Sequence, residues 1–419
     1  MTFAAPILAV LVAAWAVAAG AILFAYRRDA VRAWREPTLR GPLLIIESDD
    51  WGPGPAQDAS WLARIAEVLG RYRDRRGRHP VVTIGVVLAL PAGATGAGSP
   101  SAAVTLAADR FRGIRERLVA GADAGLMALQ LHGMEHYWRP ALIAAAGTDP
   151  TVARWLQGEG GLRTEALPSH LQTRWADASR LPSVPLWPDQ IADAVREELS
   201  TFAEIFGRPA TVAVPPTFVW DERVEREWAR GGIRFIVTPG RRYVGRDEAG
   251  GLVADGEGIH SGERGVGGVV YLVRDRYFEP SLGQDAGSAL AALAEKTRAG
   301  RPALLEMHRF NFTGDAAAAT NAVRELDRLF ASALTAYPEL RFLSTDELGE
   351  RIAARDADLL ETRLVRRMAT WLVRLAELPR LRKLAWLTGL AIPAWLFLLV
   401  ARTAGRGGGV ESAGGRLVT

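Results

Sequence analysis

The sequence predicts an α/β protein: a distorted seven-stranded (β/α) barrel over residues 41–356, flanked by two transmembrane helices. Three observations support this fold class. Short apolar runs alternate with longer amphipathic segments, as in parallel sheets covered by helices. A long uncharged run stands near each end of the chain. The 419 residues, 49% of them hydrophobic, suffice for one barrel-sized domain.

The first element is an apolar run near the N-terminus. Residues 2–26 carry no charge, and this length exceeds the roughly 20 residues that a helix needs to cross a bilayer. We therefore predict a transmembrane helix over residues 1–26. A cleaved signal peptide is the alternative, but no positively charged segment precedes the run.

The barrel region contains eight predicted strands, each a short apolar run. Amphipathic segments that we predict as helices lie between them, and seven or eight such units suit a barrel better than a doubly wound sheet. Neither a G-x-G-x-x-G after the first strand nor a P-loop motif is present, so a dinucleotide-binding fold and a P-loop fold lose their main sequence signal. The predicted strands are 42–47, 81–89, 126–131, 211–214, 234–237, 269–273, 303–307 and 341–343, and the predicted helices lie near 57–76, 107–120, 188–206, 221–230, 285–299, 315–336 and 344–354. Residues 91–104 and 138–187 are predicted insertions.

A second apolar run follows the barrel. Residues 357–383 form a basic amphipathic linker, and residues 384–401 are an uncharged run of 18 that we predict as a C-terminal transmembrane helix. A buried or interfacial helix is the alternative for this run. The glycine-rich tail, 402–419, is predicted to be disordered.

Charge is unevenly distributed along the chain. Residues 41–362 carry an excess of seven acidic side chains, whereas the two ends carry an excess of eleven basic ones. A nucleic-acid-binding protein would place its positive excess on the folded domain, so we exclude nucleic acid as a partner. The basic residues gather on the domain side of both apolar runs, which predicts an integral protein of the cell inner membrane with its folded domain in the cytoplasm. They are Arg27, Arg28, Arg32, Arg35, Arg40, Arg363, Arg366, Arg367, Arg374, Arg380, Arg382 and Lys383.

Polar residues follow several predicted strands at the end where a barrel carries its chemistry. The chain has no cysteine, so a metal site must be built from His, Asp and Glu. Asp49 and Asp50 follow the first strand, and their side chains point in different directions, so that one could bind a metal while the other acts as a base. A lone Asp-Asp pair is otherwise typical of a turn that caps a helix.

Three histidines stand at two other strand ends. His132 and His136 follow the third strand with the i, i+4 spacing that lets two imidazoles share one cation. His308 follows the seventh strand. A buried core histidine is the alternative for each one alone, but three strand ends that converge favour one site.

The order of these motifs resembles the polysaccharide deacetylases, carbohydrate esterases whose catalytic domain is a distorted (β/α) barrel, and the resemblance covers roughly residues 41–350. It implies that Asp49 is the catalytic base and that Asp50, His132 and His136 bind the metal. It further implies that His308 is the general acid, and that Pro216, within Val214–Phe218, lines the sugar groove. Departures are Ser48 before the Asp pair and Gly133 after the first histidine. The family's arginine that holds the base has candidates here in Arg208 and Arg309.

The residues themselves predict a metal-dependent hydrolase. A divalent ion, zinc first by its ligand set, would lower the pKa of a bound water to about 7 while an acid protonates the leaving group. We therefore expect removal of acetyl groups from an N- or O-acetylated sugar or polysaccharide precursor. Predicted substrate contacts are Trp51, Tyr137, Pro216, Phe218 and Arg309. The alternatives are a divalent-metal-dependent glycosyltransferase and an inactive, glycan-binding protein of the deacetylase fold.

Overall fold

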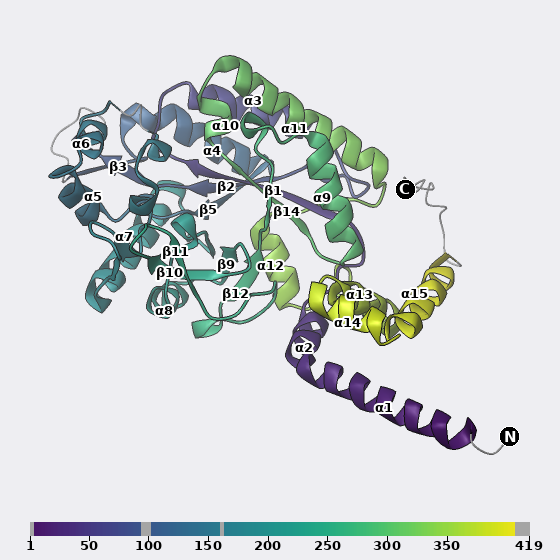
Figure 1. Cartoon of the computed structure of the whole chain (residues 1–419). Helices are drawn as coiled ribbons and strands as arrows, with labels where there is room; N and C mark the ends of the chain where they lie inside the picture. The colour runs from purple at the N-terminus through teal and green to yellow at the C-terminus, as the bar shows by residue number, and fades with distance from the viewer. Residues whose placement is uncertain (1–3, 94–101, 160–162, 407–419) are drawn as a thin grey trace. The chain divides into compact units, whose positions relative to one another are not determined.

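The computed structural model describes residues 4–93, 102–159 and 163–406. The chain divides into two compact units, which we describe separately. The barrel unit comprises residues 41–297 and 302–356, and the terminal unit comprises residues 1–40, 298–301 and 357–419. Figure 1 shows the elements of both.

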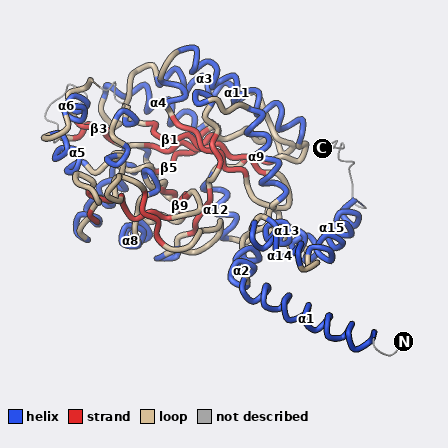
Figure 2. Tube along the Cα trace, in the orientation of Figure 1, coloured by secondary structure: helices blue, strands red, loops and turns tan. Residues whose placement is uncertain are grey.

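The barrel unit is built on a parallel sheet of nine strands, in the order β12-β9-β8-β5-β2-β1-β14-β13, with β15 added beside β1. Its apolar strand residues, such as Ile46, Ile84 and Leu305, are fully buried. Figure 2 shows the curled sheet among its helices. The strands are β1 (Leu43–Trp51), β2 (Val82–Val86), β5 (Met127–Leu131), β8 (Val212–Ala213), β9 (Phe235–Thr238), β12 (Val270–Val273), β13 (Arg276–Tyr277), β14 (Ala303–His308) and β15 (Arg341–Phe342).

One segment changes partner within this sheet. β12 pairs with β9, and after only Arg274 and Asp275 the chain continues as β13, which pairs in parallel with β14. Counted as one strand, this segment leaves eight strands in a curled parallel sheet with an irregular seam, so the α/β class is confirmed, but the strand number differs from the seven predicted. The partner change places Arg274 beside the carboxyl ends of β1 and β14.

Amphipathic helices cover the sheet close to their predicted positions. Local signals explain their limits: α8 begins at Asp221, whose side chain accepts hydrogen bonds from two backbone N–H groups, and α7 ends at Gly207 in the left-handed region. The helices are α3 (Asp58–Gly70), α4 (Arg112–Asp123), α7 (Pro188–Phe206), α8 (Glu222–Arg230), α9 (Ala286–Arg298), α10 (Phe310–Thr313), α11 (Ala316–Ala336) and α12 (Thr345–Ala353).

Both predicted insertions are present. The first forms the hairpin of β3 (Ala89–Pro91) and β4 (Ala103–Thr105), although residues 94–101 lie outside the described part. The second, after Tyr137, has its own apolar cluster, which includes Trp155. Its elements are α5 (Arg139–Ala146), α6 (Pro150–Leu156), two short 3-10 turns, and the hairpin of β6 (Ala176–Asp177) and β7 (Val184–Pro185). A further hairpin joins β10 (Arg242–Arg246) and β11 (Leu252–Asp255).

The terminal unit joins both ends of the chain. Its helices are α1 (Ala4–Ala25), α2 (Arg27–Arg35), α13 (Leu364–Ala376), α14 (Pro379–Leu387) and α15 (Ala391–Arg406). Arg374 of α13 is buried and donates to backbone carbonyls of residues 33, 36, 37, 299 and 300. Trp34 and Trp371 pack edge to face at 6.2 Å. The basic linker is thus largely a helix fixed to the N-terminal segment.

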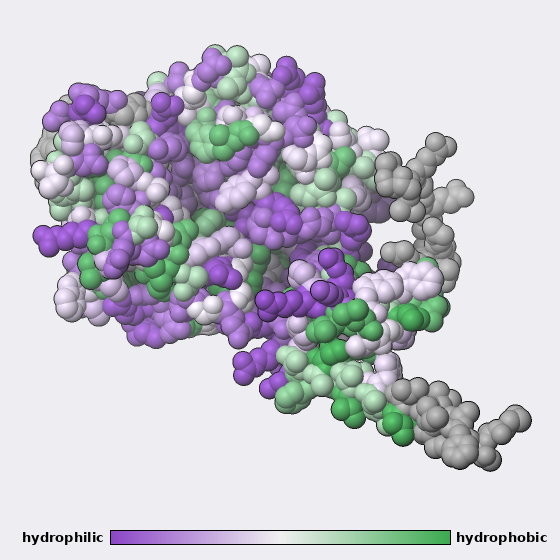
Figure 3. Space-filling model, in the orientation of Figure 1, coloured by the Kyte–Doolittle hydropathy of each residue, from purple (hydrophilic) through white to green (hydrophobic). Residues whose placement is uncertain are grey.

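The second predicted span is not one helix. Within the described residues, no single helix is long and apolar enough to cross a membrane. The pair α14 and α15 passes that test only together, and its two helices meet at 103°. The break contains Gly389 at φ 74°, which favours glycine. Figure 3 shows apolar side chains gathered on the surface of the terminal helices.

Candidate metal and acid-base site

Three predicted metal ligands meet at the carboxyl ends of the strands. The Oδ1 atom of Asp50, on β1, lies 3.2 Å from Nε2 of His132 and 3.5 Å from Nε2 of His136. Both histidines follow β5, which is separated from β1 only by β2. All three side chains are buried. The sheet order therefore brings together residues that are more than 80 positions apart.

Unusual backbone conformations produce this convergence. The register of β1 against β2 shifts between Ser48 and Trp51, and Asp50 within that bulge has φ 69°. Gly133 has φ 95°, and a Cβ there would lie 3.2 Å from Arg174 and 3.4 Å from Pro216. Of the four non-glycine residues with positive φ in the described chain, Asp50, Thr217 and Phe218 belong to this region. Such strain concentrates at functional sites.

The donor atoms fit a divalent cation. The carbonyl of Val214 accepts a hydrogen bond at 2.9 Å from Nδ1 of His132, which leaves the Nε2 lone pair free for a metal. Oδ1 of Asp50 is buried and has no hydrogen-bond partner. Burial, opposed by Asp50, lowers the pKa of His136 to about 4, so this imidazole is neutral as a ligand must be. One carboxylate with two imidazoles is a ligand set that suits zinc.

The neighbouring carboxylate, Asp49, is held by an arginine. Arg274 donates from Nη2 to Oδ2 of Asp49 at 2.6 Å and from Nη1 to Oε2 of Glu47 at 2.7 Å. Burial alone would raise the pKa of Asp49, but Arg274 and His132 outweigh it and lower the pKa. The other oxygen of Asp49, Oδ1, is buried without a hydrogen-bond partner. Asp49 is therefore ionised and has one oxygen available to take a proton.

On the other side of Asp49, His308 carries a protonated imidazole. Strand register places His308 of β14 directly opposite Asp49 of β1. Its Nδ1 donates to Oε1 of Glu279 at 2.6 Å, and Asn311 also donates to Glu279. Burial would lower the pKa of His308, but the hydrogen bond to Glu279 and the charges of Asp50 and Glu306 raise it to about 10. His308 is therefore a cation at neutral pH.

Glu306 lies between His308 and Arg274, the partner of Asp49. Its Oε1 lies 3.3 Å from Nη2 of Arg274 and 3.5 Å from Nε2 of His308. Burial, opposed by Arg274 and His308, raises the pKa of Glu306 to about 6. The donor atoms of Asp49, Glu306 and His308 are close enough to form a second metal-binding group. Arg274 already supplies the cation at this place, so we assign no metal there.

A buried ion network supports the metal-binding turn from behind. Glu135, between the two histidine ligands, accepts a hydrogen bond at 2.9 Å from Arg174 of the second insertion. Arg174 also donates to Glu198 at 2.9 Å, and Trp228 donates to the other oxygen of Glu198 at 2.7 Å. Both glutamates are almost inaccessible to solvent. The sequence offered no role for Glu135, and the structure gives it that of anchoring the turn.

Three predicted substrate contacts are buried, and their prediction is corrected. Trp51 is 0% exposed, donates to Ser48 and packs on Phe312. Tyr137 is also 0% exposed and lies edge to face with Trp155. Arg309 is 5% exposed and pairs with Asp58 at 2.8 Å. Each side chain packs inward against an apolar or charged partner, so a sugar cannot reach it in this conformation.

The other two predicted contacts, Pro216 and Phe218, do lie in the loop beside the site. Pro216 is buried near Gly133, whereas the half-buried ring of Phe218 has the guanidinium of Arg274 at 5.5 Å from its centroid. Arg208 is exposed and Arg309 pairs with Asp58, so Arg274 holds Asp49 and neither predicted arginine does.

Sequence reasoning missed Arg274 and Glu279 because neither belongs to a motif of fixed spacing. A signal was nevertheless present. The charged run from Arg274 to Glu279 follows the apolar strand β12, at the same edge of the sheet as the other site residues. The role of Arg274 depends on the partner change of this segment, which residue spacing does not reveal.

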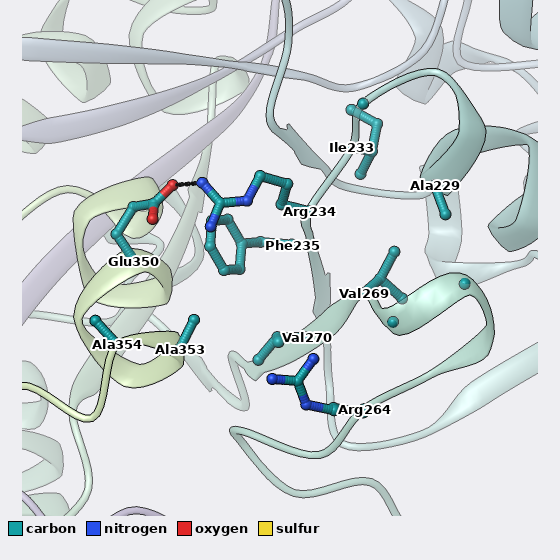
Figure 4. Close-up of a pocket in the computed structure, with 13 residues that line it drawn as sticks. Ala229, Ile233, Arg234, Phe235, Arg264, Val269, Val270, Glu350, Ala353 and Ala354 are labelled. Carbon is teal, nitrogen blue, oxygen red and sulfur yellow. Dashed lines mark hydrogen bonds and ion pairs between the residues drawn. The ribbon is translucent and has the colours of Figure 1, made fainter.

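A separate cavity lies at the opposite ends of the strands. It has a volume of about 490 Å³ and is lined by residues that include Arg234 and Phe235 of β9, Val270 of β12, Arg264 and Glu350. Figure 4 shows Arg234 turned toward Glu350, with which it forms an ion pair. None of the predicted site residues lines this cavity, so we assign it no part in catalysis.

Comparisons with known proteins do not place the chain in a family. No family model matches the sequence, and no curated protein does. Solved structures that match include polysaccharide deacetylases and family 4 carbohydrate esterases. A candidate polysaccharide deacetylase from Mycobacterium smegmatis has a TM-score of 0.40 at 12% identity, with 77% of this chain and 94% of that chain covered. A peptidoglycan deacetylase from Bacillus subtilis has a TM-score of 0.36 at 12% identity, with coverages of 76% and 94%.

A solved structure of an enzyme with another activity matches this chain with a similar TM-score. A 4-alpha-glucanotransferase from Thermococcus litoralis has a TM-score of 0.37 at 10% identity, with 73% of this chain and 39% of that chain covered. Likeness at this level does not separate a deacetylase from a glucanotransferase. The functional argument therefore depends on the positions of the site residues.

Proposed function

We propose that this protein is a metal-dependent hydrolase that removes acetyl groups from an N-acetylated, or O-acetylated, sugar or polysaccharide precursor. One observation carries the proposal. A three-residue donor set for a divalent cation, Asp50, His132 and His136, lies beside an ionised carboxylate and a cationic imidazole on adjacent strands. Hydrolysis of an acyl bond needs these three parts: an electrophilic centre, a base and an acid.

The side chains have distinct tasks in this reaction. A divalent ion at Asp50, His132 and His136 would polarise the acyl carbonyl and lower the pKa of a water molecule. Asp49, oriented by Arg274, takes a proton from the attacking water through its free Oδ1. His308, oriented by Glu279, gives a proton to the leaving nitrogen or oxygen through Nε2. An acid that stays protonated matches an amide, because an amine leaves poorly without a proton.

The two alternative functions receive less support. A glycosyltransferase that binds a sugar nucleotide through a metal would not need a cationic histidine held by Glu279 opposite the base. An inactive binding protein would not need the paired supports of Asp49 and His308. Opposite pKa shifts at a neighbouring carboxylate and imidazole, downward at Asp49 and upward at His308, are typical of catalytic sites.

We further propose that the terminal unit attaches the enzyme to the cell inner membrane, with the uncharged run of residues 2–26 crossing it and the barrel unit in the cytoplasm. Exposed apolar side chains on the terminal helices and the basic residues on the domain side of both apolar runs support this placement. An Arg or Lys beside an anionic leaflet contributes about 1 kcal/mol of attraction. The substrate would then be a precursor made at the cytoplasmic face, such as a lipid- or nucleotide-linked N-acetyl sugar.

The activity is tested by incubating the full-length, zinc-loaded protein in detergent with N-acetylated and O-acetylated glycans, and measuring released acetate. We expect acetate from at least one N-acetylated substrate and none after the metal is removed with a chelator. Release that persists without metal would contradict the metal-dependent reaction. Equal release from matched amide and ester substrates would contradict the preference for an amide.

A further inference from the structure

The second apolar segment changes direction in the middle. α14 and α15 meet at 103° around residues 388–390. A hydrogen bond from another helix contacts this break. The indole N–H of Trp15, on α1, donates to the carbonyl of Thr388 at 2.6 Å. Gly389 lies in the left-handed region at φ 74°, where other residues are strained. This geometry ends one helix and starts another.

Neither half reaches across a bilayer. The apolar part of α15, Ala391–Ala401, spans only about 16 Å at a helical rise of about 1.5 Å per residue, against a hydrocarbon core about 30 Å thick. α14 is shorter still, with 9 residues, and it carries the exposed charges Arg380, Arg382 and Lys383. At an angle of 103° the two lengths do not add up along the membrane normal.

The surface of the pair nevertheless fits a lipid environment. Its exposed apolar side chains include two indoles, which favour the membrane interface, and its basic residues match anionic headgroups. Six of these apolar residues are more than half exposed: Trp386 (64%), Leu387 (74%), Ile392 (57%), Trp395 (54%), Leu396 (51%) and Val400 (66%).

Charge on the far side of the segment also opposes a crossing. Residues 402–419, which follow the apolar part of α15, contain Arg402, Arg406 and Arg416 against the single acid Glu411. A crossing would carry these arginines to the outside, against the rule that short flanking segments rich in Arg and Lys stay in the cytoplasm. A segment that enters and leaves on the same side keeps all basic flanks together.

We propose that α14 and α15 form a re-entrant hairpin in the inner leaflet of an anionic membrane, beside α1, and that the chain crosses the membrane only once. The C-terminal tail then lies on the same side as the barrel unit. This inference rests on the proposed membrane attachment through the terminal unit, and it is independent of the deacetylase activity.

The absence of native cysteine makes the topology directly measurable. Single-cysteine variants of the full-length chain place a thiol before α1 (Thr2→Cys), on the exposed loop between β10 and β11 (Ala249→Cys), or in the tail (Ser412→Cys). A membrane-impermeant maleimide is applied first to spheroplasts and then to inside-out vesicles. The unmodified chain is the background control, and acetate release shows separately whether each variant is a working enzyme.

We expect the thiols at positions 249 and 412 to react only in inside-out vesicles, and the thiol at position 2 only in spheroplasts. Reaction of position 412 in spheroplasts, with position 249 still protected there, would show a second crossing and overturn the hairpin. Recovery of the chain in the wash of alkaline-extracted membranes would overturn both the hairpin and the membrane attachment. Neither result would bear on acetate release.

Discussion

Arg274 donates a hydrogen bond from Nη2 to Oδ2 of Asp49 at 2.6 Å, and both side chains are 1% exposed. The two residues are 225 positions apart in the chain. The contact leaves Oδ1 of Asp49 as the oxygen without a partner and keeps the carboxylate ionised despite its burial. If Asp49 is the base, as we propose, it is ionised and oriented before a substrate binds.

The metal site gives the first prediction. His132→Ala should remove most of the bound metal, because it deletes one of three protein ligands and the one whose tautomer Val214 fixes. Elemental analysis after dialysis against zinc should find about one ion per chain in the parent. His170→Ala, which changes a half-buried histidine in the insertion, is the control and should keep the metal. Equal zinc in the parent and His132→Ala would refute the ligand assignment.

The division of labour between the two aspartates gives the second prediction. Asp49→Asn should retain zinc but lose on the order of a hundredfold or more in kcat, as expected when a general base is removed. Asp50→Ala should lose both zinc and activity. The measurement is metal content and acetate release on the same samples. A parental rate in Asp49→Asn would mean that the base is another group.

The buried ion network behind the turn with His132 and His136 gives the third prediction. Glu135→Gln keeps the shape of the side chain but weakens its charge-assisted contact with Arg174, so the turn that carries His132 and His136 should be held less firmly. We expect zinc affinity to fall about 10- to 100-fold, the usual effect of losing an outer-shell partner. Titration calorimetry of the apo protein measures it. Glu197→Gln, on the exposed surface of α7, is the matched control, and the idea fails if the two variants bind zinc alike.

The acid gives a prediction about pH. His308 must be protonated to act, and its pKa near 10 keeps it so at neutral pH, so the loss of this proton should lower kcat/KM only at alkaline pH. A bound cation opposes the pull of Asp50, so we expect that limb somewhat below 10. Glu279→Gln removes the charge that accepts the Nδ1 hydrogen bond and should move the limb to lower pH. A limb that stays in place would show that His308 is not the titrating acid.

Much of the fold could be predicted from the sequence, because buried parallel strands are apolar throughout and their helices are strongly amphipathic. The strand β13 could not, since Arg276 and Tyr277 form no apolar run. The five polar positions of the proposed chemistry could also be found, because each stands at the end of a recognisable strand. Their partners Arg274, Glu279 and Glu306 are fixed by strand register and by the partner change at the seam, which leave no local pattern.

The aromatic residues show where the sequence suggests a role that the structure does not support. Trp51 and Tyr137 directly follow site residues, so the sequence favoured them as sugar contacts. The structure turns both inward, onto Phe312 and Trp155. In an alternating or bulged segment, a neighbour in sequence often lies on the other face of the chain. Proximity in sequence to a catalytic group is therefore weak support for a substrate contact.

The central claim is that Asp49 and a metal at Asp50, His132 and His136 together hydrolyse an acetyl group. The most direct measurement is acetate released from an N-acetylated glycan by the zinc-loaded full-length chain, compared with Asp49→Asn loaded to the same zinc content. The account predicts sustained release by the parent and at least about a hundredfold less by Asp49→Asn. Release of acetate at the same rate by both proteins, or a product that shows glycosyl transfer instead of acetate, would contradict it.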